Sequence, residues 1–437
     1  MKIFLLTMFI LLISTPVFAA SSVEITGERA KPSYWLTEDG DQVLMNRTQL
    51  RQFNAQIRAK DTHATNLFHY PTQMPSAAVN KLLRDTSTEN TYEVNSIVKV
   101  QYAVTINRAD MRLLPKPWSG DKYDDFQATA IDPAQPVAVL LESDDKQFVF
   151  CQSRDYFGWI DRNSLAFTDR MTWESYIAPR DFLVVVDNKK RIKVKGKDIL
   201  FQMGAVIPLI PNETDLHGSP EQEWKNFVEN EYTTAMIPIK IPAFPSIAAN
   251  KNENAGWLAR LPSSVDGRLQ EIYVSIADDK SVNKGWLPCT QNNIIRQAFK
   301  FLGDEYGWGG LNESVDCSAF VQDIYRSMGV FIPRDANRQE ACLPIISVFN
   351  DVGTSMRYDI VRRAPVGSLL FKPGHVMLYL GTDKKGTPLI IHAMSSYFEN
   401  GEKIFKRKVI VGDLTYKNGA GVMTIDGLTG IGGIIRH

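Results

Sequence analysis

One cysteine and two histidines in the last third of the chain have the types and surroundings that acyl transfer by a thiol needs. Cys317 lies in the run Asp316-Cys317-Ser318, and His375 and His392 lie in two strand-like runs downstream. A thiolate is a strong nucleophile, and a neighbouring imidazole that takes the thiol proton activates it near neutral pH. The three residues therefore indicate attack on an amide carbonyl, a thioester intermediate, and hydrolysis.

The segment after the cysteine is predicted to be a helix that positions the thiol. Apolar residues such as Ile324 and Met328 recur at helical spacing, and Gly329 stands where a helix would end. Asp316 is a favourable N-cap, which places Cys317 in the first turn. Unpaired N–H groups and the helix dipole favour an anion there, so we expect this thiol to lose its proton more readily than a free one.

The two histidines are predicted to lie on neighbouring antiparallel strands. If the strands end at Leu380 and restart at Thr387, His375 lies opposite His392. Side chains in that position share a face and are about 5 Å apart at Cβ, so His392 is expected to orient the ring of His375. Zinc binding by Cys317 and both histidines is the alternative, but no CxxC or HxxxH spacing supports it. We therefore predict no metal and no cofactor.

Changes in periodicity divide the 437 residues into parts that would position this site. Residues 1–19 have the apolar core and small-residue end of a secretory signal peptide, so we expect an exported protein, periplasmic or extracellular, with no membrane span after signal removal. Residues 20–97 are predicted to form a helical accessory segment. Residues 98–168 and 169–288 alternate with period two, as small all-β units do. Residues 289–437 carry helices and then antiparallel strands, which predicts an α+β domain.

Composition excludes some functions and leaves the cysteine pairing open. Lys plus Arg and Asp plus Glu are 49 each, and without a long basic run we expect no nucleic-acid partner. Four cysteines are too few for a disulfide framework. Cys151 and Cys289 are interpreted as small buried residues, although a bridge between Cys289 and either Cys151 or Cys342 remains an alternative. We expect a monomer.

Five motifs in this order resemble the NlpC/P60 cysteine peptidases of bacterial cell walls. They are YGWGG from Tyr306, then DCSAFVQ, IPRDANRQ, GHVMLYLG and LIIHA. The two β regions resemble bacterial SH3 domains. The resemblance implies an α+β chain in which a papain-like NlpC/P60 catalytic domain is preceded by two SH3-like β-barrels and an N-terminal helical segment. The chain departs from the family at Ala319, usually glycine, and at Ala336, often serine.

The resemblance also implies roles for single residues. The implied catalytic residues are the nucleophile Cys317, the base His375, the orienting residue His392, and Tyr306 beside the developing oxyanion. The implied substrate-binding residues meet the free amino end of the substrate or support that pocket, and they are Asp316, Ser318 and Arg334.

The implied activity is that of a γ-D-glutamyl-L-diamino acid endopeptidase. Its substrates and partners would be peptidoglycan stem peptides or muropeptides, with a preference for a free N-terminal L-alanine. A wall-binding protein without activity and an acyltransferase on the same fold are the alternatives. Release of free peptides or amino acids, as against transfer products, would separate the hydrolase from the acyltransferase.

Overall fold

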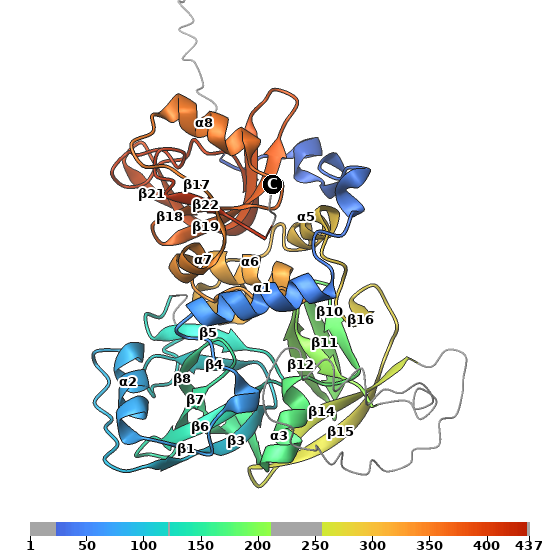
Figure 1. Cartoon of the computed structure of the whole chain (residues 1–437), viewed down its shortest axis with the longest axis vertical. Helices are drawn as coiled ribbons and strands as arrows, with labels where there is room; N and C mark the ends of the chain where they lie inside the picture. The colour runs from blue at the N-terminus through green and yellow to red at the C-terminus, as the bar shows by residue number, and fades with distance from the viewer. Residues whose placement is uncertain (1–22, 121–122, 211–255, 435–437) are drawn as a thin grey trace, which may run out of the picture.

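The computed structural model describes residues 23–120, 123–210 and 256–434. The predicted signal peptide at 1–19 and part of the second predicted β region, 211–255, lie outside these residues. Figure 1 shows the C-terminal helices and sheet above two β-rich parts that lie side by side, with helix α1 (Arg47–Lys60) running across the boundary. Within the described residues, no helix has the length and apolar character needed to cross a membrane.

The N-terminal segment contains the two helices that its pattern predicts. α1 begins after Asn46, whose side chain accepts from the Gln49 amide while the Gln49 side chain accepts from the Asn46 amide. This reciprocal capping box satisfies two donors that a helix start leaves unpaired. α2 (Ser76–Thr86) follows Pro75 and buries Val79 and Leu83 against the first β unit. Short 3-10 turns precede α1: η1 (Gly27–Ala30), η2 (Pro32–Tyr34) and η3 (Asp39–Asp41).

The lead before α1 packs along the C-terminal domain. The Ile25 amide donates to the Val411 carbonyl at 2.8 Å, and Trp35 is buried in the core shared with α5 and α6. Asp41 forms a two-pronged ion pair with Arg296 of α5. The N-terminal segment therefore contacts the domain that carries the candidate nucleophile, although more than 200 residues separate them in the sequence.

The first β unit is an antiparallel sheet around a core that includes Phe150 and Trp159. Its strands are runs in which apolar side chains alternate with period two, and turn residues separate them, as the sequence predicts. They are β3 (Gln101–Thr105), β4 (Ala109–Arg112), β5 (Gln127–Ile131), β6 (Pro136–Glu142), β7 (Phe148–Gln152), β8 (Phe157–Asp161) and β9 (Leu165–Thr168). The short β1 (Gln73–Met74) pairs with β2 (Val98–Lys99) ahead of it.

The second β unit has its own core, which includes Leu183, Phe201 and Leu261. Helix α3 (Arg170–Ile177) leads into it. Its strands are β10 (Phe182–Val185), β11 (Lys189–Val194), β12 (Lys197–Gln202), β13 (Val206–Pro208), β14 (Trp257–Val265), β15 (Arg268–Ile276) and β16 (Val282–Lys284). β15 also pairs with β9, so one nine-stranded sheet runs through both units, in the order β14-β15-β9-β3-β6-β7-β8-β4-β5.

The C-terminal domain has helices first and an antiparallel sheet after, which confirms the predicted α+β class. Its helices are α5 (Gln291–Lys300), η7 (Trp308–Glu313), α6 (Cys317–Arg326), α7 (Ala336–Cys342) and α8 (Thr354–Arg363). Its strands, in sheet order, are β17 (Ile345–Val348), β22 (Gly430–Gly432), β18 (Leu369–Lys372), β19 (His375–Thr382), β20 (Pro388–Glu399) and β21 (Glu402–Gly412).

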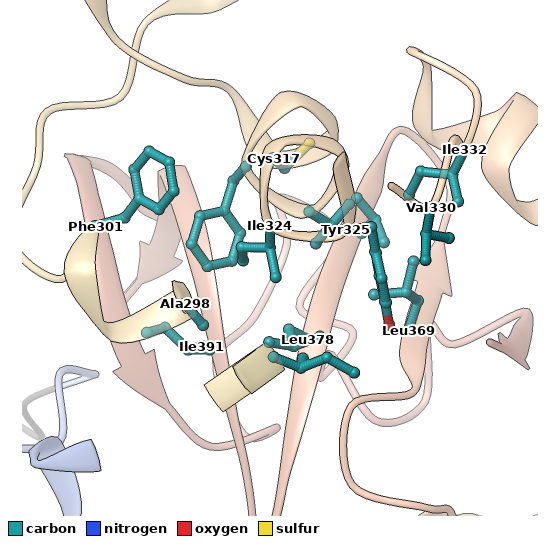
Figure 2. Packing of buried hydrophobic residues seen from close by; sticks show 14 of the residues in the cluster. Ala298, Phe301, Cys317, Ile324, Tyr325, Val330, Ile332, Leu369, Leu378 and Ile391 are labelled. Atoms are coloured by element: carbon teal, nitrogen blue, oxygen red, sulfur yellow. The ribbon is translucent and has the colours of Figure 1, made fainter. Parts of the chain in front are cut away.

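The amphipathic face of α6 holds the helix on one side of this sheet. Figure 2 shows Ile324 and Tyr325 of α6 pointing toward Leu369 and Leu378 of the strands. Alternate strand residues form a second core on the opposite side of the sheet, where α8 contributes Val361. Since successive side chains of a strand point to opposite faces, these two cores fix which residues face α6.

The predicted pairing of the two histidines is wrong by two residues. β19 and β20 pair Leu378 with Ile391, which is not the register that puts His375 opposite His392. β19 runs past Leu380 to Thr382, into a turn where the Asp383 carboxylate accepts two backbone N–H groups, and a bulge lies just before that turn. Because an even shift preserves side-chain parity, both imidazoles still lie on one face, as diagonal neighbours.

Candidate active site

Cys317 is the first residue of α6. The Asp316 carboxylate caps the helix by accepting the Ala319 amide at 2.8 Å, as the sequence predicts. The cysteine is 7% exposed, and the backbone N–H of Val376 lies against its sulfur. Since Val376 follows His375, the start of β19 reaches the start of α6. The chain thus brings the thiol and the imidazole together across 58 residues.

The expectation of a readily ionised thiol is wrong for this structure. Burial, the largest cause, and the Asp316 carboxylate raise the pKa of Cys317 to about 12. The N–H of Val376 and the Arg334 guanidinium act in the opposite direction but do not outweigh burial. Burial, with His392 and Lys372 beside it, also holds the pKa of His375 well below its ordinary value. The resting site therefore pairs a neutral thiol with a neutral imidazole.

The two imidazoles form a directed pair. Nε2 of His375 lies 2.7 Å from Nδ1 of His392, so one proton is shared between them. His392 is fully buried and its ring stacks on Tyr416 at 5.6 Å. Burial and then the Lys372 charge lower the pKa of His392 to about 3, which keeps this ring neutral.

Only one tautomer of this pair leaves a base for the thiol. If His375 donates its Nε2 proton to His392, its Nδ1 carries a lone pair that can accept the thiol proton. His392 then carries its own proton on Nε2, an atom that is buried without a hydrogen-bond partner among the described residues. The reverse tautomer would place a proton on Nδ1 of His375 and remove its basicity.

Asp316 is occupied by protein donors. Arg334 donates to its two oxygens at 3.1 and 2.6 Å, and both side chains are less than a tenth exposed. Ser318 and the Gly309 amide also donate to it. Burial would raise the pKa of Asp316, but the charge and hydrogen bonds of Arg334 outweigh burial, so the pKa is lowered. This carboxylate is therefore a charged structural centre rather than an open acceptor.

The first β unit forms part of the wall of the site. Arg334 donates from Nε to the Thr129 hydroxyl of β5 at 2.8 Å. The neighbouring Gln127 side chain donates to the Gly309 carbonyl at 3.1 Å. Gly309 and Gly310 both have positive φ, and a Cβ at Gly309 would lie 2.9 Å from the Gln127 carbonyl oxygen. The last two of the three glycines of YGWGG are thus needed for the close approach of this loop to β5.

Asp335, which the sequence reasoning left unassigned, completes the wall together with Tyr156. Asp335 directly follows Arg334 and is half-buried, and burial raises its pKa although Arg334 opposes that shift. The Tyr156 hydroxyl of the first β unit lies against the Asp335 carboxylate. The signal was present in the IPRD motif, where a carboxylate stands beside an arginine expected in the pocket.

Tyr306 lies near Cys317, the candidate nucleophile, as predicted. Burial is the largest cause that raises the pKa of its hydroxyl, and the nearby Asp316 and Cys317 add to it. The hydroxyl therefore keeps its proton and can donate it in a hydrogen bond. The structure brings together all the residues singled out in the sequence: Cys317, His375, His392, Tyr306, Asp316, Ser318 and Arg334. Within the part of the chain that the structure describes, no group of three or more His, Cys, Asp or Glu is arranged to hold a metal ion.

A thiol at a helix start, in contact with the start of an antiparallel strand that carries one of two paired imidazoles, is the arrangement of the papain-like fold. Two family models match this chain. The NlpC/P60 family matches residues 303–399, and the SH3 domain of the SH3b1 type matches residues 113–161. The chain therefore carries an NlpC/P60 peptidase domain behind a bacterial SH3 domain, which confirms the family resemblance seen in its motifs.

The chain is also similar to named proteins. Dipeptidyl-peptidase 6 of Lysinibacillus sphaericus is 36% identical over 92 residues, which are 21% of this chain and 30% of that protein. The chain thus matches less than a third of this relative's length. An NlpC/P60 endopeptidase from Photobacterium damselae subsp. piscicida has the same fold over 90% of this chain and 91% of its own, with a TM-score of 0.63 and 14% identity. An NlpC/P60 family protein from Bacillus cereus ATCC 10987 is 14% identical over 77% of this chain and all of its own, with a TM-score of 0.48.

Proposed function

We propose that this chain is an exported cysteine endopeptidase that hydrolyses peptidoglycan stem peptides or muropeptides at the γ-D-glutamyl–diamino acid bond. The observation that carries this proposal is the contact of the Cys317 sulfur, at the start of α6, with the backbone N–H of Val376, which directly follows His375 of the imidazole pair. The bond specificity rests on the family resemblance. Bacterial SH3 and cell-wall peptidase domains in one chain support a periplasmic or extracellular location. The division at 20–97, 98–168, 169–288 and 289–437 remains part of the proposal.

In the proposed mechanism, proton transfer and attack occur together because the resting thiol is neutral. Nδ1 of His375 accepts the Cys317 proton as the sulfur attacks the scissile carbonyl carbon. Tyr306 donates a hydrogen bond to the oxygen that becomes negative. His375 then protonates the leaving amine, and a thioester to Cys317 remains. Water, deprotonated by His375, attacks the thioester; the acid product forms as the Cys317 sulfur leaves and takes the proton back from His375, while His392 holds the ring in the productive tautomer.

For the free amine of the substrate, Asp335 fits better than Asp316. Protein donors already occupy both oxygens of Asp316 with an arginine charge, whereas half-buried Asp335 has the Tyr156 hydroxyl as a hydrogen-bond partner and a long contact, 4.0 Å, with His63. An ammonium group that enters a partly closed site needs a carboxylate, since leaving it unpaired costs several kcal/mol. We therefore assign the amine to Asp335 and a supporting role to Asp316, which Arg334 neutralises.

The activity is tested with purified protein and L-Ala-γ-D-Glu-diaminopimelate, with the products identified by mass. We expect release of L-Ala-γ-D-Glu and the free diamino acid, with no transfer products. Cys317→Ala should abolish the release and keep the parent's melting curve. Cys342→Ala, at a buried cysteine outside the site, is the matched control and should retain activity. Unchanged turnover by a folded Cys317→Ala variant would end the thiol-peptidase interpretation.

Amine recognition is tested separately by acetylating the L-alanine amine of the same peptide. The parent should cut the free peptide faster than the acetylated one, and Asp335→Asn should reduce that difference. If the acetylated peptide is cut equally fast by the parent, amine recognition is wrong, and an enzyme that acts on intact wall becomes the better interpretation.

A further inference from the structure

A lysine stands directly beside the predicted base. β18 ends at Lys372, β19 begins at His375, and the two residues are paired across a tight turn. The turn is Pro373-Gly374, and Gly374 has φ of 71°, which is the sequence and conformation of a type II turn. Residues directly opposite in an antiparallel pair share a face, with Cβ atoms about 4.5–5.5 Å apart. The Lys372 and His375 side chains therefore leave the sheet together.

The Lys372 ammonium has an aromatic neighbour but no acidic partner. Nζ lies 5.0 Å from the centre of the Tyr416 ring, and the same ring stacks on His392. Burial lowers the pKa of Lys372, and the charged group that opposes this shift is the Cys317 thiolate when it forms. Among the described residues, no carboxylate forms an ion pair with Lys372.

An unpaired, half-buried cation at this place is unfavourable for the resting enzyme. Charged groups that leave water are normally paired, and a cation–π contact compensates only a small part of the lost hydration. The charge also lowers the pKa of His375 and His392, which opposes the imidazolium that the mechanism needs. An anion bound to Lys372 would remove both costs, so the site is built to receive a negative group from the substrate.

We propose that Lys372 binds the free α-carboxylate of the γ-linked glutamate and so selects substrates that carry a carboxylate beside the scissile bond. This inference rests on the proposed function. In a γ-linked glutamate the α-carboxylate is four bonds from the scissile carbonyl carbon, an extended span of about 5 Å. That carboxylate stays on the half of the substrate that is attached to Cys317, so the contact holds through both chemical steps. Binding also neutralises the charge beside His375, which makes this ring a better base when substrate is present.

The test uses two peptides that differ at one group. One is L-Ala-γ-D-Glu-diaminopimelate, and the other carries D-isoglutamine, in which the α-carboxylate is a carboxamide. Charge-assisted hydrogen bonds predict that the parent prefers the carboxylate peptide by roughly 10- to 100-fold in kcat/KM. Lys372→Met should bring this ratio close to one, mainly because kcat/KM for the carboxylate peptide falls. Lys372→Arg should still prefer the carboxylate peptide. Lys403→Met, at an exposed lysine of β21, is the matched control and should keep the parent's ratio.

A second measurement separates binding from chemistry. In the Cys317→Ala background, calorimetry should show that Lys372→Met weakens binding of the carboxylate peptide and leaves binding of the carboxamide peptide nearly unchanged. If Lys372→Met lowers kcat/KM by the same factor for both peptides, the lysine acts only through the imidazoles and the inference is wrong. If the parent cuts both peptides equally well, the inference fails while the proposed function stands. If the parent cuts neither peptide nor any other stem peptide, the proposed function itself fails.

Discussion

The buried pair of Asp316 and Arg334 allows a quantitative test of the architecture around the nucleophile. Asp316→Asn keeps the size of the side chain and its ability to cap α6, because asparagine is as good an N-cap as aspartate. It removes the negative charge and leaves Arg334, 6% exposed, with neutral side-chain acceptors, namely the new amide oxygen and the hydroxyls of Ser318 and Thr129. The substitution therefore isolates the electrostatic part of the interaction.

The expected magnitude follows from burial of both partners. Removing one member of a buried ion pair typically costs about 3–5 kcal/mol, because the other charge stays desolvated without compensation. We expect Asp316→Asn to lose about that much free energy of unfolding in the C-terminal domain. The double variant with Arg334→Met should be more stable than Asp316→Asn alone, since the uncompensated charge is gone. Asp359→Asn breaks an exposed pair with Arg362 and should cost less than ~1 kcal/mol.

The assay is urea unfolding at several pH values, with hydrogen exchange of the α6 amides as the local readout. The folded-state pKa of Asp316 lies below its ordinary value of 3.8, so its stabilisation is present above that pH and is lost as pH falls through the folded pKa. The parent should therefore lose stability below about pH 4 more steeply than Asp316→Asn. If Asp316→Asn is as stable as the parent, the reasoning is refuted. It is also refuted if the double variant with Arg334→Met is less stable than Asp316→Asn alone.

Two further predictions concern the imidazole pair and the docking of the β unit. His375→Ala should reduce kcat by the ~10²–10⁴-fold that proton transfer contributes, and His392→Ala by less, with partial rescue in His392→Asn; equal losses in all three would count against this division of roles. Gly309→Ala places a Cβ against β5 and should increase proteolysis between the first β unit and the C-terminal domain, whereas Gly353→Ala, where the added Cβ meets open space, should leave it unchanged. Equal proteolysis in both glycine variants would contradict the proposed close approach.

Local features of this chain were predictable from its sequence. The start of α6 follows from Asp316 as a cap and from apolar residues at helical spacing, and both act within a few residues. The order of the motifs indicated the NlpC/P60 domain before any distance was known. The common face of His375 and His392 also survived an error in register, because side-chain parity depends only on the strand period and the shift was even.

Features that depend on distant neighbours were decided by the tertiary structure. The register of β19 and β20 depended on the turn that Asp383 closes and on a bulge, neither of which the strand pattern contains. The pKa of Cys317 depended on burial, which outweighs the helix dipole that the sequence made visible. The role of Asp316 depended on Arg334, 18 residues away, and on Thr129 in another domain. A sequence records which groups are present, whereas their charge and availability depend on the solvent that folding removes and the partners that it supplies.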